Sequence, residues 1–494
     1  MLWLCLHLPD FALEIFARGM SVTGPLAVVH GQGRRQRVVL CNAAARRCGV
    51  RPGMGTGAAL ALAGSLRICG RDVESERAAL DRLAGWAGRF TPVVSRMPPQ
   101  ALLLEIAGSC RLFGGVDRLQ DMVRRGVAEL GYQVSMAAAP TPLAASWLVH
   151  AGQDVCVIQQ SALAAALSPL PLACLGLAAE RQEVLHGMGI RTVGDCLRLP
   201  RDGLARRMGP QLVYVLDQAL GRIPDPRPAF VAPAAFTGSL PLPAPACTAE
   251  GLLFPVRRLL LELEGFLRAR DQGARSLVLS LRHASGTATR LGLGLVVPSR
   301  DAAHLAMLMR ERLERVALPA PVEEVSLHVA RPCPLAPHSQ DFFAPTHVAE
   351  DGVLIERLRA RLGRAAVHGL GLVAEHRPER AWACAEPGEQ GAAAGTESVR
   401  QARGSAHASR EAAARKRPLW LLRDPVRLEV HGGHPYLDGT LVIAGNRERI
   451  ESGWWDGQDI ARDYFVVRTR QGARLWVYRE LDGGRCWFLH GIFG

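Results

Sequence analysis

Two short segments near the N-terminus place polar side chains at the ends of apolar runs, where an active site could be built. His7 and Asp10 follow the run LWLCL, and Gln100 precedes the run ALLL, which ends at Glu105. A site for hard cations such as Mg²⁺ needs several carboxylates that converge from strand ends, because hard cations prefer oxygen ligands. The acids here are few and scattered, so we expect no metal site. Asp10, Glu14 and Glu105 are the acids that could rescue one.

Arginine supplies almost all of the positive charge. The 494 residues include 59 Lys+Arg against 46 Asp+Glu, for a formal net charge of +13, and Lys416 is the only lysine. No GxxxxGK[ST] phosphate-binding loop is therefore present, and a lysine Schiff base is a poor hypothesis. An arginine-rich surface recognises phosphate, carboxylate or aromatic groups. Nucleic acid is the leading partner, and a GC-rich genome that fills solvated faces with arginine is the alternative.

Cysteine usage and hydropathy indicate the compartment. The twelve cysteines are scattered without a CxxC pair, which argues against a zinc ribbon or a disulfide scaffold. His7 has no second His or Cys at ligand spacing, so a polar residue at a strand end is a better interpretation than a zinc ligand.

No apolar run reaches about 20 residues, and residues 1–16 lack a basic region and a cleavage site. We expect a cytoplasmic protein that needs no cofactor and does not bind membranes.

The hydrophobic periodicity predicts an α+β chain of several domains. The order strand, helix, strand, strand, helix, strand is typical of a ferredoxin-like fold, and it is expected over 2–8, 75–91, 92–97, 101–107, 115–130 and 132–138, with a further helix at 141–151. Residues 13–72 form an insertion, and residues 236–330 repeat the layout on a smaller scale.

A glycine-rich turn at 185–192 has the form hxGhGxxT between two short helical segments. In a helix-hairpin-helix the glycines permit a tight turn, and backbone N–H groups then face a DNA phosphate without reading sequence. An ordinary glycine turn is the alternative. The residues predicted to bind DNA are Gly187, Gly189, Ile190, Arg191 and Thr192.

The order of these parts resembles the Y-family translesion DNA polymerases. The resemblance covers nearly the whole chain and implies a right-hand architecture with a small β domain appended to it. The implied parts are a palm (1–12 and 73–164), fingers (13–72), a thumb with the helix-hairpin-helix (165–230), a little finger (235–332), a connector with a clamp-binding peptide (333–384), a disordered linker (385–417) and a C-terminal β domain (418–494).

Five motifs in the last quarter of the chain narrow the resemblance to a catalytically degenerate branch, the polymerase-like proteins of bacterial mutagenesis cassettes. They are HRPERAW (376–382), RPLWLL (417–422), ESGWWDG (451–457), ARDYFVVR (461–468) and WFLHGIFG (487–494). This similarity implies two protein partners, an error-prone C-family polymerase subunit and a RecA-like accessory protein.

The polymerase motifs depart from the family pattern at the positions that carry chemistry. The first-strand motif DxDxFFAxVE places His7 at the metal-binding aspartate, with Ala12 at the aromatic position that excludes ribonucleotides. The second motif, SIDEAYLD, places Gln100 and Ala101 at its Asp-Glu pair and leaves Glu105 in a structural position. These departures imply that the chain is not an enzyme.

The triphosphate site departs from the pattern as well. In the fingers motif SYEARKxGV the arginine is kept as Arg46, a vestige of the nucleotide site, but the tyrosine has become Ala43. The lysine of the palm motif has become Pro142.

Residues 337–345 contain a segment that resembles the clamp-binding peptide QxDLF of bacterial polymerases. Such peptides place two adjacent apolar side chains in a pocket of the sliding clamp. Gln340 stands one residue late in the pattern, and a structured loop with two core phenylalanines is the alternative. The residues predicted to bind the clamp are Ser339, Gln340, Asp341, Phe342 and Phe343.

The segment 418–494 mixes aromatic residues with arginines, so three roles remain open for it. The aromatics could form the core of a small β domain, stack on single-stranded bases, or dock other cassette proteins. Taken together, the sequence predicts a non-catalytic adaptor in translesion synthesis and damage-induced mutagenesis. An active translesion polymerase and a general DNA-binding repair module are the alternatives.

Overall fold

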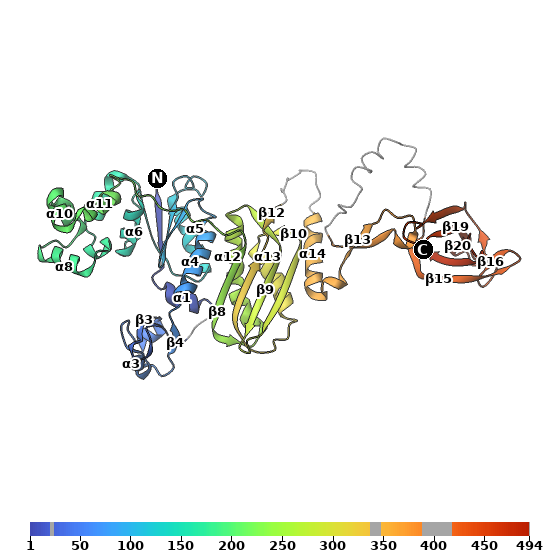
Figure 1. The fold of residues 1–494 in the computed structure, drawn as a ribbon, viewed down its shortest axis with the longest axis horizontal. Helices are drawn as coiled ribbons and strands as arrows, with labels where there is room; N and C mark the ends of the chain where they lie inside the picture. Colours follow the sequence, from blue (N-terminus) through green and yellow to red (C-terminus); the bar gives the residue numbers. More distant parts are fainter. Residues whose placement is uncertain (20–23, 336–346, 388–416, 494) are drawn as a thin grey trace. The chain divides into compact units, whose positions relative to one another are not determined.

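The computed structural model describes residues 1–19, 24–335, 347–387 and 417–493 (Figure 1). The chain divides into two compact units, Met1–Arg361 and Leu362–Gly494. The predicted clamp peptide, Ser339 to Phe343, lies outside the described residues, as do Lys416 and most of the predicted linker.

The first unit is built on a four-stranded antiparallel sheet with the strand order β5-β6-β1-β7. Its strands are apolar on both faces. Leu4 and Leu6 of β1 face helices α4 and α5, whereas Trp3 and Cys5 face α6 and the helices that follow it. The elements are β1 (Trp3–His7), α4 (Val73–Ala87), β5 (Val94–Met97), β6 (Ala101–Glu105), α5 (Val116–Glu129), β7 (Ser135–Ala139) and α6 (Pro142–His150). The ferredoxin-like palm predicted from the sequence is confirmed.

The inserted segment forms a small module with its own core. A short helix, α1 (Phe11–Ala17), precedes a three-stranded sheet of order β3-β2-β4. The other elements are β2 (Leu26–His30), β3 (Arg37–Cys41), α2 (Ala43–Arg47), α3 (Thr56–Leu62) and β4 (Arg67–Gly70). The core holds small apolar side chains, among them Ala27, Val38 and Ala45.

Short helices follow the palm, and their leucines bury the face of the sheet that α6 covers. Leu163, Leu185 and Leu212 belong to the same core cluster as Trp3 of the palm. These helices are α7 (Leu163–Leu167), α8 (Ala179–Gly187), α9 (Val193–Arg198), α10 (Arg201–Met208) and α11 (Pro210–Ala219).

The next segment repeats the element order of the palm, as predicted, but its strand order differs. Its main sheet runs β10-β9-β11-β8, so the first strand lies at the edge, whereas β1 lies inside the palm sheet. Strand β9 pairs with β10 on one side and with β11 on the other, and β11 also pairs with β8. The elements are β8 (Phe236–Ala246), α12 (Ala249–Arg268), β9 (Gln272–His283), β10 (Ala288–Ser299), α13 (Ala302–Leu313), β11 (Val322–Val329) and β12 (Cys333–Pro334).

Helix α14 (His347–Leu362) packs against this second sheet. The buried carboxylate of Glu356 accepts a hydrogen bond from the backbone N–H of Val296 at 2.7 Å and lies 2.6 Å from Nε2 of His304. Ala360 joins the core of the sheet.

Helix α12 also packs against palm helix α4. The close approach requires a glycine at 265, because a Cβ there would lie 2.1 Å from Cδ1 of Trp86. Beside this contact, Glu262 forms ion pairs with Arg18 and Arg82, and the side chains of Glu262 and Arg18 are 2% and 1% exposed. A shared apolar contact and a buried ion cluster thus join the two sheets of the first unit.

The second unit is mainly antiparallel β. One sheet has the order β16-β15-β21-β20-β19-β17, with β18 paired to β19. A separate hairpin of β13 (Gly369–Leu372) and β14 (Trp382–Ala385) precedes it. The sheet's elements are β15 (Trp420–His431), β16 (His434–Tyr436), β17 (Val442–Ile443), β18 (Glu448–Ser452), β19 (Ile460–Arg468), β20 (Arg474–Glu480) and β21 (Trp487–Ile492). The predicted C-terminal β domain is confirmed.

The aromatic residues of this sheet form its interior. Tyr464, Trp476, Tyr478 and Trp487 are all less than a tenth exposed, which favours the core interpretation for these four side chains. Among the described residues, no helix combines the length and the apolar character that are needed to cross a bilayer.

Candidate functional site

The polar residues of the two polymerase motifs meet at one end of the palm sheet. The antiparallel register of β1 and β6 places His7 opposite Ala101. Nε2 of Gln100 lies 2.8 Å from Nε2 of His7, and the ring of His7 lies 4.5 Å from that of His150 on α6. The structure therefore brings together His7, Gln100 and Ala101.

His7 is uncharged at neutral pH and already has a hydrogen-bond partner. Burial, together with the neighbouring His150, lowers the pKa of His7 to about 4. The amide nitrogen of Gln100 can only donate, so Nε2 of His7 accepts and its lone pair is occupied. An imidazole engaged in this way is not presented to a cation.

The acids that could rescue a metal site do not converge on His7. Glu105 lies opposite Trp3, four residues away from His7 along the strand, or about 13 Å. Its Oε1 accepts hydrogen bonds from the backbone N–H groups of Leu2 and Ala107, each at 3.2 Å. Glu105 therefore has a structural role, because it joins the backbone of Leu2 to that of Ala107 at the far end of the sheet.

Glu14 and Asp10 also have other partners. Oε1 of Glu14 accepts a hydrogen bond from the backbone N–H of Gln133 at 2.7 Å, and burial raises the pKa of Glu14 to about 7. Asp10 lies 3.4 Å from the guanidinium of Arg46. Within the described part of the chain, no group of three His, Cys, Asp or Glu side chains could hold a metal ion. The donor set at this end of the sheet does not fit a pair of Mg²⁺ ions, which need converging oxygen ligands.

Arg46 and Pro142 are the two residues that the motifs align with the nucleotide site of a polymerase. Arg46 is exposed on the fingers, whereas Pro142 is buried in the palm. Arg46 is about half exposed on α2, and its partner is Asp10. Pro142 is the buried first residue of α6, where its fixed backbone starts the helix and its ring carries no charge. The palm side thus offers no cation to a triphosphate at this position.

The predicted helix-hairpin-helix is formed by α8 and α9. Gly189 has a φ of 76°, in the left-handed region that a tight turn requires. Ile190 is buried, and Thr192 begins α9 with a capping box in which Asp195 is the partner. Gly187 is the last residue of α8 rather than part of the turn.

The backbone donors of this hairpin are already occupied. Oδ2 of Asp195 accepts from the N–H groups of Arg191 and Thr192, both at 2.9 Å, and these bonds lower the pKa of Asp195 to about 2. The N–H groups of Met188, Gly189 and Ile190 bond to carbonyls of α8. A phosphate would have to displace a carboxylate here, or bind the exposed side chain of Arg191 instead. The acid at the third position after Thr192, Asp195, is the sequence signal for a capping box, and the glycine motif alone does not include it.

Two of the C-terminal motifs contact each other, which sequence reasoning missed. Arg377 of HRPERAW is only 3% exposed, and it forms ion pairs with Glu375 at 2.7 Å and with Asp456 of ESGWWDG at 2.8 Å. It also donates to the carbonyl of Gln458 at 3.0 Å. These residues fix the β13–β14 hairpin to the large sheet of the second unit, whereas Trp454 of the same loop is 81% exposed.

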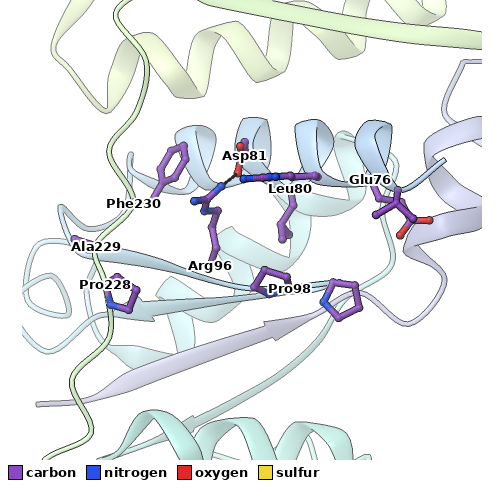
Figure 2. A pocket seen from close by; sticks show the side chains of 11 residues that line it. Glu76, Leu80, Asp81, Arg96, Pro98, Pro228, Ala229 and Phe230 are labelled. Atoms are coloured by element: carbon purple, nitrogen blue, oxygen red, sulfur yellow. Dashed lines mark hydrogen bonds and ion pairs between the residues drawn. The ribbon is translucent and has the colours of Figure 1, made fainter.

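A cavity of about 380 Å³ lies between α4, β5 and the segment 228–230 (Figure 2). Leu80, Pro98 and Phe230 form part of its apolar wall. Arg96 and Asp81 line it too, but they form an ion pair with each other, and the guanidinium carbon of Arg96 lies 5.4 Å from the centre of the Phe230 ring. The charges of Arg96 and Asp81 are thus satisfied within the chain.

Comparisons with known proteins identify relatives of this chain. The IMS family (impB/mucB/samB) matches residues 14–149. A DNA polymerase IV from Shewanella sp. (strain ANA-3) is 26% identical over 206 residues, which cover 40% of this chain and 56% of the relative. Residues 14–149 are therefore a domain of the Y-family polymerase type. Protein ImuB from Caulobacter vibrioides (strain NA1000 / CB15N) is 31% identical over 474 residues, which cover 90% of this chain and all of the relative. The chain belongs to the ImuB family.

Solved structures similar to this chain are also Y-family polymerases. The Y-family DNA polymerase chimera Dbh-Dpo4(243-245)-Dbh has a TM-score of 0.40 and 16% sequence identity, and covers 67% of this chain and 98% of its own. DinB from Sulfolobus solfataricus has a TM-score of 0.39 and 17% identity, and covers 68% of this chain and all of its own.

Proposed function

We propose that this protein is a non-catalytic, polymerase-shaped adaptor of translesion synthesis. The observation that supports the proposal is the end of the palm sheet, where His7 and Ala101 lie opposite each other and Gln100 bonds to His7. The motif resemblance assigns these three residues to the positions of the family's catalytic acids. A neutral imidazole bonded to an amide cannot replace carboxylates that hold two Mg²⁺ ions. The protein would grip DNA in the cytoplasm and leave synthesis to another enzyme.

The adaptor would hold three kinds of partner. DNA would be bound through phosphate contacts, including those at the predicted thumb residues Gly187 to Thr192. The sliding clamp would take the peptide from Ser339 to Phe343. An error-prone C-family polymerase subunit and a RecA-like accessory protein would dock elsewhere on the chain. Several weak contacts joined by linkers raise the effective concentration of each partner at one lesion.

A primer-extension assay tests the absence of catalysis. Purified protein with primed template, Mg²⁺ and all four nucleotides is expected to leave the primer unextended, while an active Y-family polymerase in a parallel reaction extends it. Asp10 is the acid nearest to the motif positions, whereas Glu105 lies at the far end of the sheet. Extension by the wild type that is lost in Asp10→Asn and kept in Glu105→Gln would show an active polymerase and overturn the proposal.

Clamp binding is tested separately by retention on immobilised sliding clamp. The wild type is expected to be retained and the double variant Phe342→Ala/Phe343→Ala to pass through, because the two side chains would fill the clamp pocket. Ser339→Ala is a matched control within the same segment and is expected to be retained. Equal retention of the wild type and the double variant would remove the clamp from the list of partners.

A further inference from the structure

The positive charge of this chain is concentrated in one small module. Residues 24–71 contain eight arginines and no Asp or Glu, so they contribute +8 of the formal net charge of +13. The segments expected to grip DNA in a polymerase are closer to balance. Residues 165–230 hold eight arginines against six acids, and residues 235–332 hold twelve against nine.

The arginines of this module are exposed and mostly lack carboxylate partners. Arg46 and Arg71 form ion pairs, with Asp10 and Glu76, and both acids lie outside residues 24–71. Among the residues that the structure describes, no carboxylate lies within ion-pair distance of the other exposed arginines of the module, which are Arg35, Arg37, Arg47, Arg51 and Arg67. A cationic side chain without an internal partner is available to an external anion.

Four arginines of the module, Arg37, Arg46, Arg47 and Arg51, stand on backbone segments that meet at one turn. Arg51 donates to the carbonyl of Arg46 at 2.6 Å, and Arg37 donates to the carbonyl of Gly53, two residues beyond Arg51, at 3.4 Å. Arg47 follows Arg46 at the end of α2. Backbone carbonyls thus hold the guanidinium groups of Arg37 and Arg51 by one nitrogen each, which leaves the other donors of each fork exposed.

The composition of the module indicates what kind of anion it binds. Residues 24–71 contain no Phe, Trp or Tyr. Protein interfaces depend on such aromatic anchors, and so does the stacking of single-stranded bases. An arginine fork pairs with the oxygens of a phosphate in a bidentate manner. Duplex DNA presents one phosphate charge per about 1.7 Å of its axis.

We propose that residues 24–71 are the main phosphate-binding module of this protein, with Arg37, Arg46, Arg47 and Arg51 on the sugar–phosphate backbone of duplex DNA. The proposal rests on the DNA binding proposed above and locates most of it in the module that a polymerase uses to hold a nucleotide. The contacts are independent of sequence because they do not reach the bases.

The test compares two quadruple variants of the full-length protein. Arg37→Gln/Arg46→Gln/Arg47→Gln/Arg51→Gln removes the cluster. The control is Arg77→Gln/Arg111→Gln/Arg118→Gln/Arg125→Gln, which removes the same charge from exposed arginines of the palm. Binding to a 20-base-pair duplex and to a single strand of equal length is measured over a series of salt concentrations. Thermal melting confirms that each variant is folded.

The cluster variant is expected to bind the duplex about tenfold or more weakly than wild type, and its plot of log affinity against log salt is expected to be shallower by about 3 to 4. The palm control is expected to lose much less of its affinity for the duplex. A cluster variant with four lysines instead is expected to recover most of the binding, because lysine still pairs with phosphate as a point charge.

Several outcomes would overturn the inference. Equal losses in the two glutamine variants would show that net charge alone matters. If the cluster variant bound the duplex as tightly as the wild type, other residues of the protein would have to bind the DNA backbone. Tighter binding of the single strand than of the duplex would show that base contacts dominate, and competition by a free nucleoside triphosphate at low micromolar concentration would show a nucleotide site. A wild type that binds no DNA at all would instead refute the proposed function itself.

Discussion

The buried ion cluster between the palm and the second sheet offers a sharp test of how the first unit is held together. Glu262 on α12 is 2% exposed, and its two oxygens meet Arg18 and Arg82. Arg18 also donates to the carbonyl of Leu130 at 2.6 Å and to the hydroxyl of Tyr132. Burial alone would raise the pKa of Glu262, but the two guanidinium groups outweigh it and keep the pKa below its usual value. The carboxylate is therefore charged, and it supplies the counter-charge of the buried Arg18 guanidinium.

Glu262→Gln keeps the shape of the side chain but leaves Arg18 as a buried cation without a counter-charge. Two charges about 4 Å apart attract each other by roughly 4 kcal/mol at an effective dielectric constant of about 20, and breaking a buried pair from one side costs about 3–5 kcal/mol. We expect the first unit to lose that amount of stability. Glu264→Gln is the control, because Glu264 pairs with Arg268 within the same helix, where such pairs contribute about 0.3–0.5 kcal/mol.

Urea unfolding followed by tryptophan fluorescence measures the difference, since Trp86 lies in the α4–α12 contact, and hydrogen exchange in α12 locates it. Arg18→Met combined with Glu262→Leu removes both charges and is expected to recover about 2 kcal/mol relative to Glu262→Gln. Stabilities of Glu262→Gln and Glu264→Gln within about 1 kcal/mol of each other would refute the reasoning, because the cluster could not then be buried as described.

Three further predictions concern single side chains. The pKa of Glu14 is about 7 in the folded chain against an ordinary value of 4.5, so the stability it contributes is complete below 4.5 and is lost as the pH rises through 7. Glu14→Gln should therefore match the wild type near pH 4.5 and exceed its unfolding free energy by up to about 3 kcal/mol at pH 8; a constant difference across that range would contradict this. Arg377→Met should lower the melting temperature of the second unit clearly more than Arg380→Met, because the side chain of Arg377 is 3% exposed and that of Arg380 is 44% exposed. Asp195→Asn should melt slightly earlier but bind DNA at least as tightly as wild type in fluorescence anisotropy, because a charge that competes with phosphate is removed; a clear loss of affinity would count against that account.

The elements of the first unit were predictable because their apolar patterns are local. The helix expected over 115–130 is observed as Val116–Glu129, and the strand expected over 2–8 as Trp3–His7. The strand order of the second sheet was not predictable, because it depends on which of several similar apolar strands pair with each other. The ion pair of Arg18 and Glu262 joins residues 244 positions apart, and neither side chain differs in sequence from an ordinary surface charge.

The candidate site was readable from the sequence in its residue types but not in its contacts. The motifs identified His7, Gln100 and Ala101 as the residues at the chemical positions. That Glu105 could not assist them follows only from the register, which places it at the opposite end of the same strands. The occupied backbone donors of the thumb hairpin likewise depend on the rotamer of Asp195, which no motif specifies.

The two halves of a polymerase active site have opposite charges, and this chain keeps only one of them. A polymerase palm contributes carboxylates and the fingers contribute cations, and the metal ions together with the triphosphate bridge the two. At the motif positions here the palm presents His7, Gln100 and Ala101, which are uncharged at neutral pH, whereas residues 24–71 carry eight cations and no anion. Among the described residues, Asp10 and Glu76 of the palm pair with only two arginines of this module. Most of the positive field of the fingers therefore acts on any nearby polyanion, and its range is about 8–10 Å at physiological salt. If residues 24–71 bind DNA as proposed, loss of the acids alone would change a nucleotide-holding module toward one that holds DNA, even with no further arginine added.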